Sequence, residues 1–490
     1  VNRWPTGWLN RWRTKMGRFF GSDLHVVNIG VSEFAHAISS EGGAVRVVDW
    51  SPPGGSEKVS RLLGLLVNHP KVEAANKKAF RQYLEADPLL IGVKSATEVV
   101  PGFGDRMLLH SGPPIVWEDM CKPVRGAIIG ACIYEDWATS PEEAESLAGS
   151  GEISFSPCHE HQAVGPMAGI ISPSMPVWMV QNQNGGNLAY STMNEGLGKV
   201  LRFGAYDSEV IQRLDWIQNV LAPHLSDTLQ RSGPIELGPL MAQALHMGDE
   251  LHNRCPAATG LLLKRLAPDL VTSSRESSDV KSCLQFMGSN DHFFLNISMA
   301  ACKSAMDAAH GVPYSTIVTA IARNGVKIGI RVSGLGDEWV TSEAPTIDGL
   351  FFPGFDSTHA NPDLGDSSIT ETAGLGAFAM AAAPAIVQFV GGTTADANAS
   401  SRRMAEITGG INQKFTIPNL NFRPINSGID VRKIVDTGIE PIINTGIAHK
   451  ESGVGQIGAG ISHVPSQVFI QALMSISDIV LEAVESSYVG

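Results

Sequence analysis

Histidine, acidic and amide side chains occur in short groups along the sequence, and these groups indicate where chemistry is possible. Cys158-His159-Glu160-His161 carries two imidazoles two residues apart, so a strand through this segment points both rings to one side. With a third ligand from elsewhere such a pair binds a metal, and without one it contacts an anionic substrate or a developing oxyanion. The sequence supplies no defined third ligand. We therefore expect no metal, and catalytic roles for His159 and His161.

A second group lies in the segment HMGDELHNR, for which the sequence predicts a helix. His246, Asp249 and Glu250 have the spacing of one helical face, and His252 is turned away from Glu250. The pattern is not the HExxH motif of zinc proteases. Two interpretations remain open, a structural cap with its hydrogen bonds and a secondary functional site.

Asn290-Asp291-His292 precedes another predicted helix, so Asn290 or Asp291 caps it and the exposed amides of the helix start can hold an anion. We expect Asn290 to bind substrate and His292 to be catalytic. Arg331 lies in the predicted strand GIRVSG, where a charge between apolar residues needs a partner. That partner is either a structural acid or the carboxylate or phosphate of a ligand.

Two further groups lie in glycine-rich segments near the C-terminus. Glu371 and Thr372 precede a predicted buried helix over residues 374–392, and Asn444-Thr445-Gly446 and His449 belong to a set of turns. Main-chain amides in such turns approach anions closely. We expect Glu371 and His449 to be catalytic, and Thr372 and residues 444–446 to bind substrate or phosphate. We also expect these groups, with those at 159–161, 290–292 and 331, to line one pocket.

The hydrophobic pattern predicts an α/β plus α+β fold that positions these residues. Residues 24–50 form a strand, turn, helix and strand, the pattern of a parallel β-α-β unit. The expected divisions are a basic Trp-rich extension (1–21), a Rossmann-like α/β domain (22–138), an α+β segment (139–206), a small helical insert (207–270) and an α+β C-terminal domain (271–490).

The Rossmann-like unit carries only a weak cofactor signal. Gly30 and Asp49 are separated like the glycine turn and ribose-binding acid of dinucleotide folds, but one of three expected glycines is present. No cofactor is therefore assigned, and a nucleotide or coenzyme A at this domain stays an open alternative.

Composition and charge exclude several classes of protein. The 490 residues have a net charge of −13 and no basic domain, which argues against nucleic acid as a partner. The six cysteines are scattered, as free thiols of a cytoplasmic protein would be. Residues 374–392 are long enough for a membrane span, but their Ala, Gly and Pro favour a buried helix. The low charged fraction of 17% fits a chain that buries surface between the subunits of an oligomer, which we expect, and it also fits one large, well-packed monomer.

The distinctive segments of the chain together resemble one protein family. They include HMGDELHN, GSNDHFFLNISMAACKSAMDAAHGVP, RVSGLGDEW, DGLFFPGF, NPDLGDSSITETAGLGAFAMAAAPAIVQFVGGT and INTGIAHKESGVGQIGAG, together with the run from His159 to Gly204. Over about residues 22–470 the chain resembles the AllG family, also called YlbE/YahG. The resemblance implies a Rossmann-like N-terminal domain, α+β domains and a small helical insert.

The same resemblance implies an activity and partners. Proteins like AllG act with FdrA-like and AllH-like subunits as an oxamate carbamoyltransferase in anaerobic allantoin and purine degradation, where oxalurate and phosphate are interconverted with oxamate and carbamoyl phosphate. The Ser-x-Arg-Thr phosphate motif of classical carbamoyltransferases is absent, so we do not expect their fold. Two alternatives stay open, another acyl or amide transfer enzyme of the coenzyme A ligase type and a non-catalytic scaffold subunit.

Overall fold

The computed structural model of the chain describes residues 18–19, 22–23, 25–48, 51–272 and 276–489, and the chain divides into two compact units, residues 1–60 and 61–490. Most of the predicted basic Trp-rich extension lies outside the described residues, and so does Asp49.

The first unit contains the β-α-β pattern that the sequence predicts. Strands β3 (His25–Ile29) and β4 (Ala44–Val48) pair in parallel, and α2 (Ser32–Ser40) connects them. Gly30 ends β3 with φ +101°, a conformation that glycine adopts readily. The described part of this sheet has two strands, and β5 (Pro88–Ser95) pairs antiparallel with another sheet. The Rossmann-like domain expected over residues 22–138 is therefore not confirmed.

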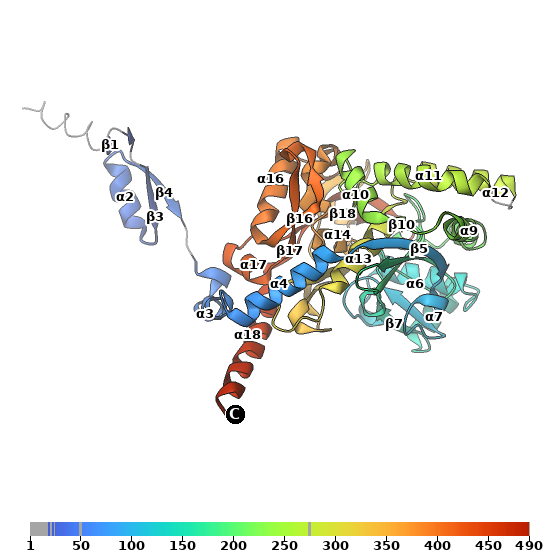
Figure 1. The fold of residues 1–490 in the computed structure, drawn as a ribbon, viewed down its shortest axis with the longest axis horizontal. Coiled ribbons are helices and arrows are strands. Elements are labelled where there is room, and N and C mark those ends of the chain that lie inside the picture. Colours follow the sequence, from blue (N-terminus) through green and yellow to red (C-terminus); the bar gives the residue numbers. More distant parts are fainter. Residues whose placement is uncertain (1–17, 20–21, 24, 49–50, 273–275, 490) are drawn as a thin grey trace, which may run out of the picture. The chain divides into compact units, whose positions relative to one another are not determined.

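The second unit is a mixed α/β body of several small sheets (Figure 1). The strand orders are β10-β5-β8-β9, β13-β12-β11-β15, β14-β19-β18, β16-β17 and β6-β7. Besides β5, their bounds are β6 Met107–His110, β7 Ser154–Pro157, β8 Pro176–Asn182, β9 Leu188–Thr192, β10 Ile235–Glu236, β11 Val318–Asn324, β12 Lys327–Val332, β13 Val340–Glu343, β14 Asp348–Phe351, β15 Leu364–Gly365, β16 Thr408–Ile417, β17 Arg423–Ile429, β18 Ile442–Ala448 and β19 Gln456–His463. The neighbours β8-β9 and β11-β12 pair as antiparallel hairpins.

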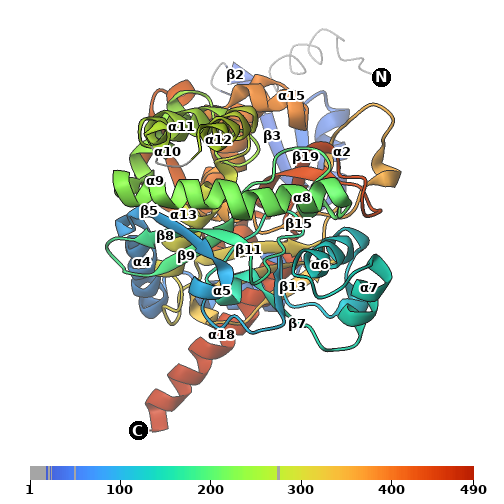
Figure 2. The ribbon, with the colours of Figure 1, turned by 90° about the vertical axis from the view of Figure 1, so that its right-hand side faces the viewer.

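Helix α13 (Leu295–Ala308) lies at the centre of this body (Figure 2). Every residue from Leu295 to Met306 is buried, because the helix contacts β5, β8 and β9 on one side and β11 on another. Its sequence is rich in Ala, Ser and Met, and these side chains allow close packing. The loop before α13 and the side chains at its far end are consequently held in a rigid core.

The remaining helices surround these sheets. Their bounds are α3 Glu57–Leu66, α4 Pro70–Glu85, α5 Ala96–Val99, α6 Lys122–Tyr134, α7 Pro141–Gly149, α14 Ile369–Thr372, α15 Val387–Val390, α16 Thr394–Met404, α17 Val431–Thr437 and α18 Ser466–Val489. Helix α7 begins at a side-chain cap, since the Ser140 hydroxyl accepts the main-chain N–H of Glu143. Among the described residues, no helix combines the length and apolar character needed to cross a membrane.

Residues 207–270 are helical, as the sequence predicts. They contain α8 (Ser208–Trp216), α9 (Ala222–Ser232), α10 (Leu237–His246) and α11 (Pro256–Val271), and α12 (Ser277–Ser289) follows. On α11 the buried residues include Ala258, Leu262, Leu266 and Leu270, at the four-residue spacing of one helical face. Apolar periodicity alone was sufficient to predict these helices.

The helix predicted over HMGDELHNR is wrong. Helix α10 ends at His246, and the chain then turns through Gly248 (φ +99°) and Leu251 (φ +69°). These two left-handed residues interrupt helical hydrogen bonding. As a result, residues 249–252 do not share a helical face with His246.

The helix predicted over residues 374–392 is also wrong, although residues 374–383 are buried as expected. It folds as short 3₁₀ turns, Gly376–Ala382 and Pro384–Ile386, followed by α15. Gly376 has φ +54° and Pro384 lacks an N–H, so a continuous α-helix cannot form here.

Candidate active site

Side-chain amides from two parts of the chain hold the turn that enters α13. Asn290 is buried, and its Nδ2 donates to the main-chain oxygen of Asn194 at 3.1 Å and to its Oδ1 at 3.2 Å. The Oδ1 of Asn290 accepts the main-chain N–H of His292 at 3.1 Å. Arg202 donates to the same Asn194 Oδ1 at 3.2 Å. Asn290 therefore caps this turn within a network that fixes the position of His292.

His292 has one ring nitrogen bonded and the other available. Its Nε2 lies 2.9 Å from the main-chain oxygen of Asn253. Because a carbonyl only accepts hydrogen bonds, Nε2 carries the ring proton and Nδ1 has the lone pair. Burial, followed by the charge of Arg202, lowers the pKa of His292 to about 4. Near pH 7 the ring is therefore neutral, and Nδ1 can accept a proton or a hydrogen bond.

His292 lines a cavity of about 320 Å³, hereafter the His292 cavity. This volume lies in the range of small-molecule sites. The other lining residues are Leu197, Gly198, Asn253, Arg254, Pro256, Asp291, Phe352, Gln456 and Ala459. They come from the segments NEGLGK, HNRCPA, NDHFF, FFPGF and GVGQIGAG, which are far apart in the sequence. The fold thus brings most of the distinctive segments of the chain to one cavity.

The cationic side chain of this cavity is Arg254. Its Nε donates to the main-chain oxygen of Gly248 at 3.1 Å, which fixes the direction of the guanidinium. The carboxyl of Glu250 accepts the main-chain N–H of Arg254 at 2.8 Å and that of His252 at 3.0 Å. Burial and the neighbouring Glu371 raise the pKa of Glu250 well above its usual value. Glu250 therefore stabilises the loop that carries Arg254 by accepting these hydrogen bonds, which supports the structural interpretation of this acid.

Glu371 and His252 form a buried pair next to this loop. The Nδ1 of His252 lies 2.8 and 2.9 Å from the two carboxylate oxygens of Glu371. Glu371 also accepts the main-chain N–H groups of Ala377 (2.9 Å) and Asn444 (3.2 Å), and the hydroxyl of Thr370 at 2.9 Å. A Cβ at residue 376 would collide with the carboxylate, so this position requires glycine. Neither member of the pair lines the His292 cavity.

Residues 444–446 are adjacent in β18, but each contacts a different part of the structure. Asn444 gives its main-chain N–H to Glu371, and its buried side-chain amide has no partner among the described residues. The Thr445 hydroxyl donates to Asp363 at 2.9 Å. Gly446 faces Gln456, a residue of the His292 cavity. Of this predicted phosphate turn, Gly446 is therefore the residue adjacent to the cavity.

The remaining predicted residues near 371 and 449 are held in local contacts. Thr372 donates to the main-chain oxygen of Ser368 at 2.9 Å, within its own turn. The ring of His449 lies 5.8 Å from that of His359, centroid to centroid, and its Nδ1 accepts the main-chain N–H of Glu451 at 2.9 Å. His449 does not line the His292 cavity.

Two of the secondary candidates have structural contacts. Asp249 accepts the main-chain N–H of Ala258 at 2.8 Å, within the first turn of α11. His246 lies at the end of α10, with Nε2 2.8 Å from the Thr416 hydroxyl. These contacts support the capping interpretation of the HMGDELHNR segment over a functional site.

His159 and His161 lie in a 3₁₀ turn (Cys158–His161), so the expectation of a strand with both rings on one side is wrong. A 3₁₀ helix has three residues per turn, and residues two apart then point in different directions. The side chain of His159 is fully buried, 3.8 Å from Asp366. His161 instead contacts the main-chain oxygen of Pro101 at 2.7 Å and the Ser156 hydroxyl at 2.8 Å.

Arg331 has the acidic partner that its position in a strand requires. Its guanidinium pairs with Asp337 and lies 3.5 Å from the main-chain oxygen of His159. The predicted site residues therefore separate into two main groups. One contains His292, which lines the cavity, and Asn290, which caps its turn. The other contains His159 and Arg331.

The Asp366 carboxyl is expected to make stability depend on pH. Asp366 is fully buried and accepts the N–H groups of Gly112 (2.8 Å) and Gly165 (3.0 Å), and burial raises its pKa to about 7. Between about pH 4 and 7 the folded chain keeps a proton that the unfolded chain releases, so the free energy of unfolding falls as pH rises. This group contributes at most about 1.4 kcal/mol per pH unit.

Urea unfolding of the wild type and Asp366→Asn at several pH values between about 4 and 7 measures this contribution. The slope of stability against pH should be less negative in the variant. Equal slopes for the two proteins would show that Asp366 ionises in the folded chain as it does in the unfolded one.

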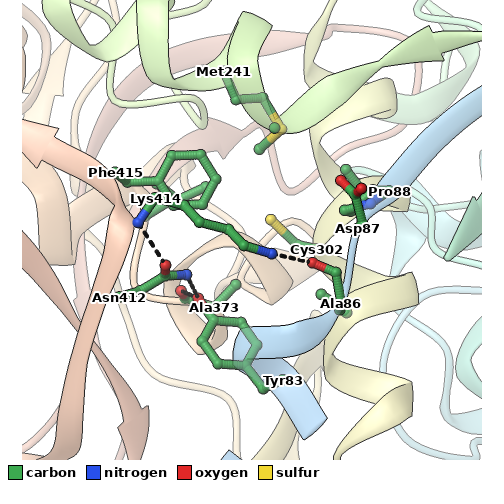
Figure 3. Close-up of a pocket in the computed structure, with 14 residues that line it drawn as sticks. Tyr83, Ala86, Asp87, Pro88, Met241, Cys302, Ala373, Asn412, Lys414 and Phe415 are labelled. Carbon is green, nitrogen blue, oxygen red and sulfur yellow. Dashed lines mark hydrogen bonds between the residues drawn. The ribbon is translucent and has the colours of Figure 1, made fainter. Parts of the chain in front are cut away.

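A second pocket, between β16, α10 and α13, is almost filled by its own side chains (Figure 3). Its free volume is about 40 Å³, enough for about one water molecule. The Tyr83 hydroxyl donates to the main-chain oxygen of Ala373 at 2.6 Å and accepts Nδ2 of Asn412 at 3.0 Å. Lys414 closes the pocket by donating to the main-chain oxygen of Ala86 at 2.6 Å. This pocket is therefore part of the packed core.

Removing the Tyr83 hydroxyl should destabilise the fold. Tyr83→Phe leaves the Ala373 oxygen and the Asn412 amide without their partner, at a cost of about 1–3 kcal/mol. Tyr190→Phe is the control, because this buried ring has no hydroxyl hydrogen bond within the described structure. Urea unfolding should show a clear loss for the Tyr83 variant and little for the control, whereas equal losses would refute this role.

Sequence reasoning missed several residues of the His292 cavity. Arg254, Asn253 and Gln456 line it, and Arg202 and Asn194 support it. Four of them lie inside segments that carry the family resemblance, and Arg254 directly follows one of these segments. The signal was therefore available, but an isolated Arg, Asn or Gln without periodic spacing gives no pattern that selects it.

Comparison with known proteins identifies the family. The family model described as oxamate carbamoyltransferase subunit AllG matches residues 153–367. The chain is 46% identical to the oxamate carbamoyltransferase subunit AllG of Escherichia coli K12 over 410 residues, which cover 83% of this chain and 98% of that protein. The chain therefore belongs to the AllG family.

Two further relatives agree with this assignment. The uncharacterized protein YahG of Escherichia coli K12 is 46% identical over 459 residues, covering 93% of this chain and 97% of YahG. A crystal structure of a conserved protein of unknown function from Enterococcus faecalis V583 is 47% identical, with a TM-score of 0.82 over 83% of this chain and 97% of that one. The mixed α/β fold is thus shared with a solved structure.

Proposed function

We propose that this chain is a subunit of a cytoplasmic carbamoyltransferase that resembles oxamate carbamoyltransferase, and that the His292 cavity binds its small carboxylated amide or ureido substrate. One observation carries the proposal. The NEGLGK, HN, NDHFF, FFPGF and GVGQIGAG segments, all part of the family resemblance, meet at one cavity that contains an arginine and a neutral histidine. The relative named oxamate carbamoyltransferase subunit AllG supplies the reaction.

The reaction can be written for oxalurate and phosphate. A phosphate oxygen attacks the carbamoyl carbon, the bond from this carbon to the amide nitrogen of oxamate breaks, and that nitrogen takes up a proton. The products are carbamoyl phosphate and oxamate. In the reverse direction the amide nitrogen of oxamate attacks carbamoyl phosphate and loses a proton.

The cavity offers groups for these steps. The Arg254 guanidinium suits the carboxylate of oxamate, because planar donors match planar oxyanions. The Nδ1 of His292 has a lone pair, so it accepts the proton of the amide nitrogen in the reverse direction and returns it in the forward direction. The Gln456 amide donates to the carbamoyl oxygen, where negative charge develops.

We propose FdrA-like and AllH-like proteins as partners, since the relative carries the name of a subunit. The test is reconstitution of this chain with both partners, followed by measurement of carbamoyl phosphate formed from oxalurate and phosphate. Product should appear only when all three proteins and phosphate are present. Absence of phosphate-dependent cleavage of oxalurate and of other ureido acids would overturn the proposed activity.

A further inference from the structure

A second group of polar side chains gathers around β12, and none of them lines the His292 cavity. We call His159, His310, Arg331 and Asp337 the Arg331 cluster. Arg331 projects from β12, and its side chain is 6% exposed, whereas that of Asp337, in the loop after β12, is 93% exposed. A nearly buried cation is thus neutralised by a carboxylate that comes from the solvent side.

One oxygen of Asp337 lies between two basic groups. Its Oδ1 pairs with Nη2 of Arg331 and is 3.7 Å from Nε2 of His310. The Nδ1 of His310 lies 2.7 Å from the Thr319 hydroxyl, which also lies 3.4 Å from the main-chain oxygen of Arg331. The arrangement is a carboxylate site occupied by a side chain of the same chain.

Other nitrogens of the cluster have no hydrogen-bond partner within the described residues. They are Nε of Arg331, Nε2 of His310 and both ring nitrogens of His159. His159 is buried beside Arg331, which lies 3.5 Å from its main-chain oxygen. Buried polar atoms without partners are unfavourable, and a native structure usually has a reason for each. The one Asp337 oxygen in the cluster leaves these nitrogens without hydrogen-bond partners.

The charged groups on the opposite side of the cluster, Lys303 and Asp366, do not provide hydrogen-bond partners for these nitrogens either. The buried ammonium of Lys303 donates to Asp307 at 2.6 Å and to the main-chain oxygen of His159 at 3.3 Å. Asp366 is already engaged with two main-chain N–H groups, and His159 Nε2 lies 3.8 Å from it, beyond hydrogen-bond distance. The Arg331 guanidinium, which faces Asp337, is therefore not neutralised from within the core.

The loop that carries Asp337 covers the cluster. Trp339 packs against both His159 and Arg331. The centroid of its ring lies 5.7 Å from that of His159 and 5.7 Å from the Arg331 guanidinium carbon. The indole N–H donates to the exposed carboxylate of Glu160 at 3.3 Å. Gly336, at φ +60°, provides the bend before Asp337. The polar contacts of this loop thus involve the exposed carboxylates of Asp337 and Glu160, which a ligand can replace.

We infer that the Arg331 cluster is a binding site for an oxyanion, and that the Asp337 carboxylate occupies it in this structure. A phosphate or a carboxylate ligand takes the place of Asp337 between Arg331 and His310. A further oxygen of the ligand then accepts from Nε of Arg331, which has no partner among the described residues. This inference does not rest on the proposed function, because a chain without carbamoyltransferase activity would still bind an anion here.

Calorimetric titration of the full chain tests the site, with inorganic phosphate in one arm and oxamate in the other. Asp337→Asn removes the internal competitor and should bind one of the two anions about tenfold more tightly than the wild type. The anion that gains affinity identifies the ligand as tetrahedral phosphate or planar carboxylate. Oxamate bound elsewhere contributes equally to both proteins and does not alter the comparison.

Glu338→Gln is the matched control, because it removes the same charge from the neighbouring exposed position. It should change the affinity by no more than about twofold, as expected for a screened surface charge. Adding Arg331→Lys to Asp337→Asn should abolish the gain, since lysine lacks the planar fork of donors. Equal affinities of wild type and Asp337→Asn, an equal gain in Glu338→Gln, or a gain that survives Arg331→Lys would each overturn the inference.

Discussion

Replacing His292 by glutamine is expected to lower the rate of carbamoyl transfer by the reconstituted complex about 10²- to 10⁴-fold, the usual contribution of a general acid–base group. Glutamine keeps a donor for the main-chain oxygen of Asn253 but has no basic nitrogen. The fold should therefore survive while the proton acceptor is lost. Initial rates at saturating oxalurate and phosphate measure the effect.

His246→Gln is the appropriate control for this experiment. The sequence placed His246 beside the functional residues, but the structure puts it at the end of α10, bonded to Thr416. Its rate should equal that of the wild type. If the His292 variant also keeps the full rate, the cavity is not catalytic, and the chain acts as a scaffold for chemistry on another subunit.

The second large effect concerns stability. Asp363→Asn is expected to lower the free energy of unfolding by about 3–5 kcal/mol, because it leaves a buried guanidinium without its counter-charge. Arg323 and Asp363 are both fully buried, and Nε and Nη2 of the arginine lie 2.9 and 3.1 Å from the two carboxylate oxygens. Thr445 and Ser462 donate to the same carboxylate at 2.9 and 2.5 Å.

Glu451→Gln tests whether burial is the cause. Glu451 forms an ion pair of similar geometry with Lys122, but both side chains are about half exposed. Exposed pairs contribute little to stability, so the urea midpoint of this variant should stay close to that of the wild type. A small effect of Asp363→Asn, or equal effects of both substitutions, would contradict the structural role given to the Arg323–Asp363 pair.

The sequence correctly predicted the elements that have a local pattern, such as turn residues after a strand or apolar residues at helical spacing. The hairpin β8-β9 follows from an apolar strand and the turn residues after it, and α11 follows from apolar residues at four-residue spacing. The parallel pair β3-β4 was predicted in the same way. The Rossmann-like domain predicted over residues 22–138 is not confirmed, because strand neighbours such as β5 and β8 are set by contacts between distant segments.

The candidate site was predicted only in part, because contacts between distant segments also determine which of its residues lie together. Asn444 and Thr445 were expected in one pocket, but adjacent strand residues point to opposite faces, and only Thr445 reaches Asp363. His159 and His161 diverge because their segment is a 3₁₀ turn. Asn290 and His292 were predicted together and lie together, since a side-chain cap links them directly.

The central claim is that the His292 cavity of this subunit binds the carboxylated amide. Titration of oxamate into the reconstituted complex, followed by calorimetry, tests it most directly. We expect one oxamate per copy of this chain, and a loss of affinity of about tenfold or more in Arg254→Gln, which removes the charge facing the carboxylate. Unchanged oxamate binding in Arg254→Gln and His292→Gln would show that the substrate binds elsewhere and would contradict the account.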